Sequence, residues 1–160
     1  MTIKELNEKG LIDKDHWLNH PNVKTEGEDV EVDRDGGVIW KYGMWCDGTW
    51  KKGIWKTGTW EDGIWKDGTW NSGIWKDGVW KDGTWEDGMW KGGTWENGTW
   101  EDGWWEGGRW EDGVWKGGIW DNGEWENGTW EDGRMWNNEL QTYKNIKGWD
   151  EDKQLFIKES

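Results

Sequence analysis

A tryptophan occupies every fifth position from Trp40 to Trp130, and a glycine stands two residues before almost every one. Written from that glycine, the repeat is G-x-W-[K/E]-[D/N/G]. Its period of five fits neither the 3.6-residue turn of an α-helix nor the two-residue alternation of a long strand. It does fit a strand of about three residues followed by a tight turn, because Asp-Gly, Asn-Gly and Gly-Gly accept positive φ. The pattern therefore predicts a regular array of nineteen short β-strands.

Comparison of the repeats with one another separates buried from exposed positions. The position before tryptophan is usually Thr, Ile, Val or Met, but it is Arg109 and Glu124 in two repeats, so it cannot face a closed core. The two positions after tryptophan are mostly charged, or Asn or Gly. Only the tryptophan and the glycine remain as interior residues, with the glycine leaving space for the indole ring. We expect Trp70 and Trp85 to be buried, and Trp104, an extra ring at the variable position, to be exposed.

Over roughly residues 40–133, the repeat resembles the pentapeptide-repeat family. In that family a large apolar residue stands at the centre of each five and a small residue two positions earlier; here the centre is Trp in place of the usual Leu or Phe. The resemblance implies a right-handed, four-sided β-helix. With about 20 residues in each coil and about 4.8 Å between coils, the array would make about five coils and a rod about 25 Å long.

The alternative architecture is a β-meander. Each Asp-Gly or Asn-Gly would then be a two-residue hairpin loop between antiparallel strands, and the indole rings would form a ladder on one face of the sheet. Such a face would be a large exposed apolar patch that has to roll up or meet a partner. The sequence therefore predicts an all-β fold, a short β-solenoid with a Trp core, and leaves the meander as its alternative.

The segments that flank the array are expected to be caps, because a solenoid exposes unpaired strand edges at its ends. Residues 1–39 are the N-terminal cap in this division, residues 40–133 the repeat array, and residues 134–160 the C-terminal cap. The sequence TIKELNEKGLI predicts a short helix that ends near Gly10. The runs LQTYKNI and QLFIKES are typical of strands.

Composition shows where the core must come from. The chain has 160 residues, 23 of them Trp, and few branched aliphatics. A packed Trp buries about 150–250 Å², so the indole rings can supply the missing core. The formal net charge of −14 argues against direct binding to nucleic acid. No apolar run resembles a signal peptide or a membrane span, so we expect a cytoplasmic or virion-associated protein.

No pattern in the sequence indicates catalysis, a cofactor or a metal. His16 and His20 are four residues apart, but Pro21 follows directly and aspartates precede, as at a solvated turn. Cys46 has no His or Cys nearby that could activate it. The Asp-Gly pairs lack the nine-residue pattern of calcium-binding β-rolls. Each Asp and Glu of the array recurs with the repeat, so we interpret them as structural and expect no enzyme.

The charges are distributed unevenly along the array. Residues 41–100 hold eight Lys and nine acidic residues, whereas residues 101–133 hold two basic and ten acidic residues. Solubility alone can explain an acidic end. The functional interpretation is a surface that attracts a protein with a basic surface. The candidate residues of that partner surface are Glu101, Asp102, Trp104, Glu106, Glu111 and Asp112.

Three functions fit these observations. The first is a non-enzymatic structural or protein-interaction module, a rigid acidic rod of the kind found in phage and bacterial assemblies. The second is implied by the family resemblance: some pentapeptide-repeat proteins imitate DNA and occupy the DNA channel of a topoisomerase. The third is glycan binding through exposed Trp rings, for which Trp104 is the best candidate.

Overall fold

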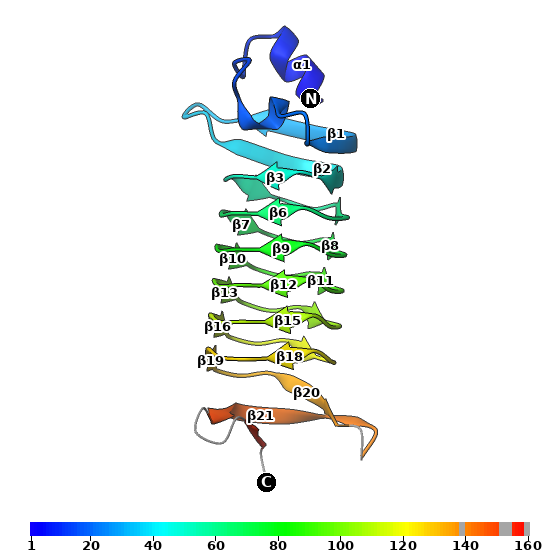
Figure 1. Cartoon of the computed structure of the whole chain (residues 1–160), viewed down its shortest axis with the longest axis vertical. Coiled ribbons are helices and arrows are strands. Elements are labelled where there is room, and N and C mark those ends of the chain that lie inside the picture. The colour runs from blue at the N-terminus through cyan, green and yellow to red at the C-terminus, as the bar shows by residue number, and fades with distance from the viewer. Residues whose placement is uncertain (138–139, 151–154, 159–160) are drawn as a thin grey trace.

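In the computed structural model, which describes residues 1–137, 140–150 and 155–158, the repeats stack into a β-solenoid with a cap at each end (Figure 1). The strands of successive coils are parallel and in register, as in the pairing of Thr69 with Thr84 and of Trp70 with Trp85. The solenoid predicted from the sequence is therefore confirmed, and the parallel pairing excludes the meander.

Each coil contains 15 residues and three strands, because every repeat strand pairs with the third strand before it and the third strand after it. The prediction of a four-sided coil of about 20 residues was wrong. The solenoid is three-sided, and its shorter coils give six strands along one side where about five coils were expected.

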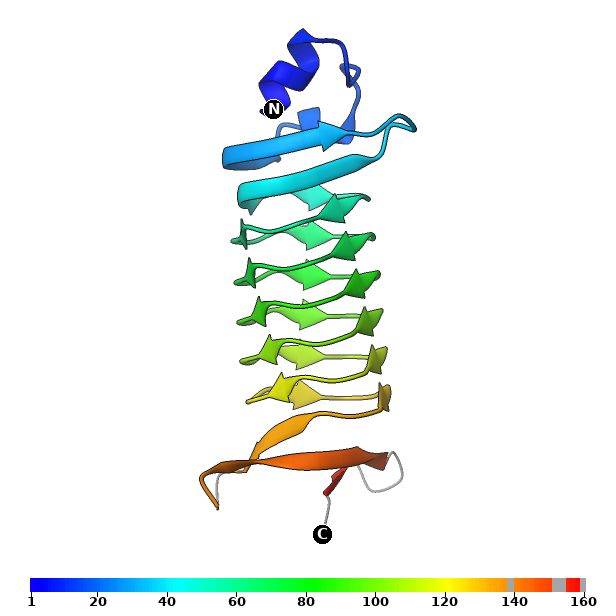
Figure 2. The ribbon, with the colours of Figure 1, turned by 180° about the vertical axis from the view of Figure 1, so that it is seen from behind.

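We name the three sides face 1, face 2 and face 3 in the order in which the chain reaches them from β2 (Val38–Asp47), and they are visible as separate columns of strands (Figures 1 and 2). Strand β2 bends across the start of faces 1 and 2, since it pairs with both β4 and β5. Face 1 contains β4 (Ile54–Trp55), β7 (Thr69–Trp70), β10 (Thr84–Trp85), β13 (Thr99–Trp100), β16 (Val114–Trp115) and β19 (Thr129–Trp130). Face 2 contains β5 (Thr59–Trp60), β8 (Ile74–Trp75), β11 (Met89–Trp90), β14 (Trp104–Trp105) and β17 (Ile119–Trp120). Face 3 contains β3 (Thr49–Trp50), β6 (Ile64–Trp65), β9 (Val79–Trp80), β12 (Thr94–Trp95), β15 (Arg109–Trp110) and β18 (Glu124–Trp125).

The core consists of three columns of stacked indole rings, one from each face. Trp85 has no exposed surface and lies 4.8 Å from both Trp70 and Trp100, with ring planes 6° apart. It also meets Trp80 and Trp90 edge to face at 5.9 Å. Offset stacks and edge-to-face pairs are the favoured geometries of aromatic rings. The expected burial of Trp70 and Trp85 is therefore confirmed.

The size of the indole ring explains why the solenoid has three sides. In the first coil, Trp40, Trp45 and Trp50 all contact one another, with centroids 5.8, 5.9 and 6.5 Å apart. In the central coils each ring likewise meets the ring of the next face edge to face, as Trp80 meets Trp85 and Trp85 meets Trp90 at 5.9 Å, so three rings surround the axis. Four rings with the same contacts between neighbours would surround a void, which close-packed protein interiors avoid.

The repeat glycines allow the coils to stack closely. Gly83 has φ +120°, and a Cβ atom there would lie 2.4 Å from the carbonyl oxygen of Gly68 in the preceding coil. The expectation that glycine leaves space for an indole ring was thus only part of the reason. The closest neighbour is backbone, and the conformation itself is one that glycine alone adopts readily.

The tight Trp core leaves buried indole N–H groups without acceptors. Within the described residues, every repeat indole from Trp40 to Trp105 has a buried N–H with no hydrogen-bond partner. The indoles of Trp110 and Trp130 donate to the carbonyls of Asn127 and Ile146 at 3.1 and 3.2 Å. An unpaired buried donor costs free energy, so ring packing must more than offset this cost in each coil.

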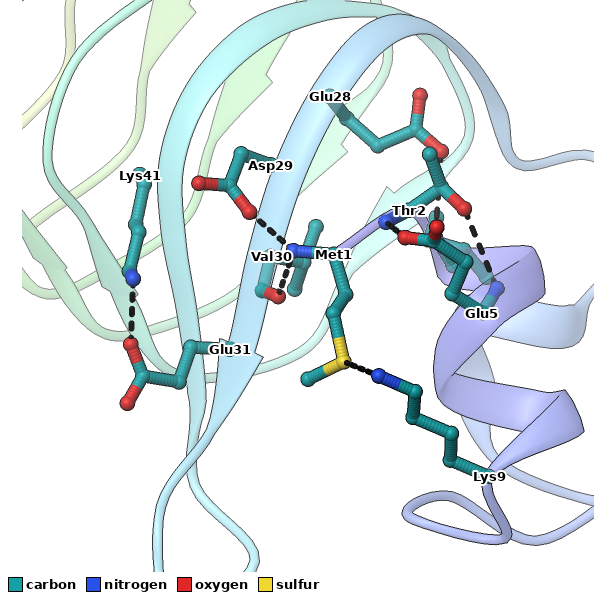
Figure 3. Close-up of polar contacts among 10 residues, drawn as sticks. Met1, Thr2, Glu5, Lys9, Glu28, Asp29, Val30, Glu31 and Lys41 are labelled. Carbon is teal, nitrogen blue, oxygen red and sulfur yellow. Dashed lines mark hydrogen bonds and ion pairs between the residues drawn. The ribbon is translucent and has the colours of Figure 1, made fainter.

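The N-terminal cap covers the first coil. It contains α1 (Ile3–Glu8), the 3₁₀ helix η1 (Trp17–Asn19) and β1 (Lys24–Val32), which pairs antiparallel with β2. The short helix agrees with the sequence prediction, and the ring of Trp17 lies edge to face on Trp50 at 5.0 Å. Figure 3 shows how α1 is held: the Met1 ammonium contacts the Asp29 carboxylate and donates to the Val30 carbonyl at 3.0 Å. The hydrogen bond from the Met1 ammonium to the Asp29 carboxylate, together with the charge of the ammonium, lowers the pKa of Asp29.

The C-terminal cap crosses the last coil. Strand β20 (Arg134–Asn137) continues face 2 and pairs with β21 (Thr142–Asp150), which pairs in turn with β22 (Leu155–Lys158). Strand β22 falls within the run QLFIKES that the sequence indicated, whereas β21 begins within the run LQTYKNI and continues past it to Asp150. Strand β20 lies outside both runs. Ile146 is buried, and the ring of Phe156 lies edge to face on Trp125 and Trp130 at 5.4 and 5.0 Å. Both ends of the indole columns are thus covered by aromatic rings.

Candidate functional site

The residue before each tryptophan points outward, and its type differs from face to face. Face 1 presents Ile54, Thr69, Thr84, Thr99, Val114 and Thr129, and face 3 presents Thr49, Ile64, Val79, Thr94, Arg109 and Glu124. On face 2, four consecutive coils present apolar side chains, which we call the apolar row: Ile74, Met89, Trp104 and Ile119. Ile74 and Trp104 are 36% and 39% exposed, so the predicted exposure of Trp104 is confirmed.

A groove runs beside the apolar row, parallel to the solenoid axis; we call it the face 2 groove. Its floor is a line of glycines, and the apolar row forms one of its walls. The opposite wall is the corner between faces 1 and 2. The floor consists of Gly73, Gly88, Gly103, Gly118 and Gly133, and the corner wall of Ser72, Asp87, Asp102, Gly117 and Asp132, with Glu101 beside them. Arg134, which is paired with Ile119, and Asn145 line the C-terminal end of the groove.

The corner wall carries fixed negative charge. The Oδ1 atoms of Asp87, Asp102 and Asp132 each accept a hydrogen bond of 2.7 Å from the N–H of the following glycine. This bond uses one carboxylate oxygen and holds the side chain at the rim of the groove. The face 2 groove therefore has one acidic wall and one wall that is apolar from Ile74 to Ile119 and ends at Arg134.

The structure brings together only some of the candidate partner residues. Glu101, Asp102 and Trp104 all line the face 2 groove. Glu106 follows Trp105 and lies at the corner between faces 2 and 3. Glu111 and Asp112 follow Trp110 and lie at the corner between faces 3 and 1. The acidic block of residues 101–133 is thus distributed around the rod.

The sequence analysis did not identify Ile74, Met89, Ile119, Asp87 and Asp132 as residues of one surface. It assumed a coil of about 20 residues, and such a coil places residues that are 15 apart on different faces. The signal was present in the sequence: reading the position before tryptophan at intervals of 15 yields the apolar row directly.

Some acidic side chains of the block have partners within the chain. Lys116 contacts Glu101 at 3.0 Å, one coil away, and Arg109 contacts Glu111 at 3.4 Å. Arg109 also pairs with Glu126, which raises the pKa of its guanidinium. These exposed pairs contribute little individually to stability, because solvent screens their charges.

The remaining chemical candidates have structural surroundings. The Nδ1 atom of His16 accepts from the Leu18 N–H at 3.3 Å, and that of His20 accepts from Asn22 at 3.3 Å. Burial raises the pKa of the Cys46 thiol, which keeps it protonated. In residues 1–137, 140–150 and 155–158, no cluster of three His, Cys, Asp or Glu side chains could hold a metal ion.

None of the described helices is long and apolar enough to span a membrane. Comparisons of the chain with protein-family models, with curated proteins and with solved structures give no match.

Proposed function

We propose that the chain is a non-enzymatic protein-interaction module, a rigid acidic rod that docks a partner protein with a basic surface along face 2. The observation that carries this proposal is the exposed apolar row beside a line of carboxylates. A contiguous apolar row on the surface of a charged protein is typical of an interaction site. A role in a phage or bacterial assembly is part of the proposal, as is a relationship to pentapeptide-repeat proteins, for which the five-residue period is the support.

The core supports a role that needs a stiff scaffold. Each ring of the central coils has two stacked and two edge-on neighbours, and each coil is hydrogen-bonded to the next, as in the bond of 2.8 Å from the Lys81 N–H to the Trp65 carbonyl. Such a column bends only by breaking contacts in a coil, so it holds groups on one face at fixed spacing.

Affinity capture with matched variants tests the proposal. Immobilised protein is incubated with an extract of the cells that make it, alongside two double variants. Ile74→Thr with Trp104→Thr disrupts the apolar row, and Ile64→Thr with Val79→Thr makes the equivalent change on face 3. Ile64 is 36% exposed, the same as Ile74.

We expect a basic protein to be retained by the unmodified rod and by the face 3 variant, and to be absent from the face 2 variant. High salt should release it, because exposed charges are screened. Equal retention by both variants would contradict the assignment to face 2. Failure of any basic protein to bind the unmodified rod would contradict the docking function.

A further inference from the structure

The width of the face 2 groove restricts what can enter it. Its walls at Asp102 and Trp104 are two residues apart in the chain, with Gly103 between them. Two residues span at most about 7 Å between Cα atoms. An α-helix with its side chains is about 10–12 Å across, so it can lie over the groove but cannot enter it. The backbone of a single extended chain needs only about 4.7–4.9 Å beside a neighbouring strand, so it can lie along the groove with its side chains directed toward the two walls.

The length of the groove sets the length of that chain. From Ser72 to Asp132 the groove crosses four coil spacings, and the neighbouring indole stacks of Trp75, Trp90, Trp105 and Trp120 are 4.7–4.9 Å apart. The groove is therefore roughly 19 Å long, and an extended chain that rises about 3.3 Å per residue covers it with about six residues.

The two walls select the side chains of the occupant. In an extended chain, successive side chains point to opposite sides. A chain that lies along the axis therefore directs one set of side chains toward the wall aspartates and the other set toward the apolar row. We propose that the face 2 groove binds an extended segment of about six residues, in which Lys or Arg alternates with apolar residues, running along the rod axis. This inference rests on the proposed docking function of face 2 and adds the form and chemistry of the bound segment.

Charge disfavours a second copy of this chain as the occupant. Face 2 packed against face 2 in antiparallel orientation, with Ile74 opposite Ile119, brings Asp87 of one copy close to Asp102 of the other. Each copy also has a net charge of −14, so the two rods repel each other.

The test uses a fluorescein-labelled eight-residue peptide in which Lys and Val alternate, with fluorescence anisotropy as the readout. One triple variant removes the wall charges and its matched control removes three aspartates from the corner between faces 3 and 1. Each of the six carboxylates accepts the same hydrogen bond from the following glycine, and asparagine already occupies the equivalent position in repeats such as Asn97 and Asn122. The groove variant is Asp87→Asn, Asp102→Asn and Asp132→Asn; the control is Asp67→Asn, Asp82→Asn and Asp112→Asn.

We expect the groove variant to bind the peptide about tenfold more weakly than the unmodified rod, from three lost charge contacts, and the control variant to bind within about twofold. Equal weakening in both variants would overturn the proposal, because attraction by net charge would then explain the binding. A peptide with four Lys followed by four Val should bind more weakly than the alternating peptide, and equal binding would overturn the alternation.

Further outcomes identify another occupant and also overturn the inference. Absence of peptide binding, while the face 2 variant still loses its partner in affinity capture, would refute the extended segment and leave docking on face 2 intact. Binding of cellohexaose that is lost in Trp104→Thr, without peptide binding, would indicate a glycan site. Dimers in sedimentation that dissociate in Trp104→Thr would indicate a second copy of the chain.

Discussion

Replacement of Trp85 by Ala tests the central feature of the fold, the continuity of the indole columns. Truncating a buried aromatic residue to Ala lowers the free energy of unfolding by about 3–5 kcal/mol, because the burial of the ring is lost and a cavity remains. The substitution also removes two stacked and two edge-to-face contacts of Trp85. Each aromatic pair contributes about 0.5–1.5 kcal/mol in addition to the free energy of burying its apolar surface. We therefore expect a loss near the upper end, about 4–5 kcal/mol.

Trp104→Ala is the matched control, since it removes the same side chain from the outer surface of the same array. Because 39% of the Trp104 surface is exposed, Trp104→Ala should lower the free energy of unfolding by at most about 1 kcal/mol. In a chain of this size, a loss of 4–5 kcal/mol corresponds to a fall in Tm of about 8–20 °C.

Guanidinium chloride titrations followed by far-UV circular dichroism measure both variants. Because a solenoid can unfold coil by coil, the slope of each transition must match that of the unmodified protein before free energies are compared. Equal destabilisation by the two substitutions, or a cost below about 1.5 kcal/mol for Trp85→Ala, would refute the three-column core.

Four other predictions follow from the coil geometry, the N-terminal cap and the acidic block. Gly83→Ala should destabilise the protein by about 1–3 kcal/mol or more, because its Cβ atom meets the backbone at positive φ. Gly92→Ala, where the new Cβ atom lies 3.4 Å from its nearest neighbour, should be tolerated in the same thermal melt. Thr84 and Thr99 are paired one coil apart, so cysteines at these two positions should form a disulfide on oxidation, in a chain in which Cys46 is replaced by Ser. A pair of cysteines about 20 residues apart that cross-links equally well would argue against a three-sided solenoid. Burial lowers the pKa of His16, so stability should be complete above about pH 6.5 and decrease as the pH falls through that value; His16→Asn should remove this part of the pH dependence, and an unchanged slope between pH 7.5 and 5.5 would contradict it. If the rod imitates DNA, neutralising the carboxylates of residues 101–112 should abolish inhibition of DNA binding by a topoisomerase at low salt, whereas absence of inhibition by the unmodified rod would refute this function.

The repeat sequence by itself determined which side chain of each short strand is buried and which points outward. The fixed tryptophan and glycine, against variable neighbours such as Arg109 and Glu124, were enough to predict a buried ring and an outward side chain in each repeat. The helix near the N-terminus was equally predictable, because Thr2 and Glu5 form a capping box that depends only on local sequence. These features follow from interactions between residues close in the chain.

The number of sides was decided only by tertiary packing, because a five-residue period is compatible with any whole number of repeats per coil. Three indole rings close around the axis in edge-to-face contact, and the stacked spacing of 4.7–5.1 Å equals the separation of paired strands, so the ring stacks and the backbone hydrogen bonds share one coil height. That packing sets the coil length at 15 residues. As a result Ile74, Met89, Trp104 and Ile119 lie on one face, whereas Glu111 and Asp112 lie at another corner. The candidate site could not be assembled from the sequence because its residues are neighbours across coils, and which coils are neighbours depends on how three large rings fill a common interior.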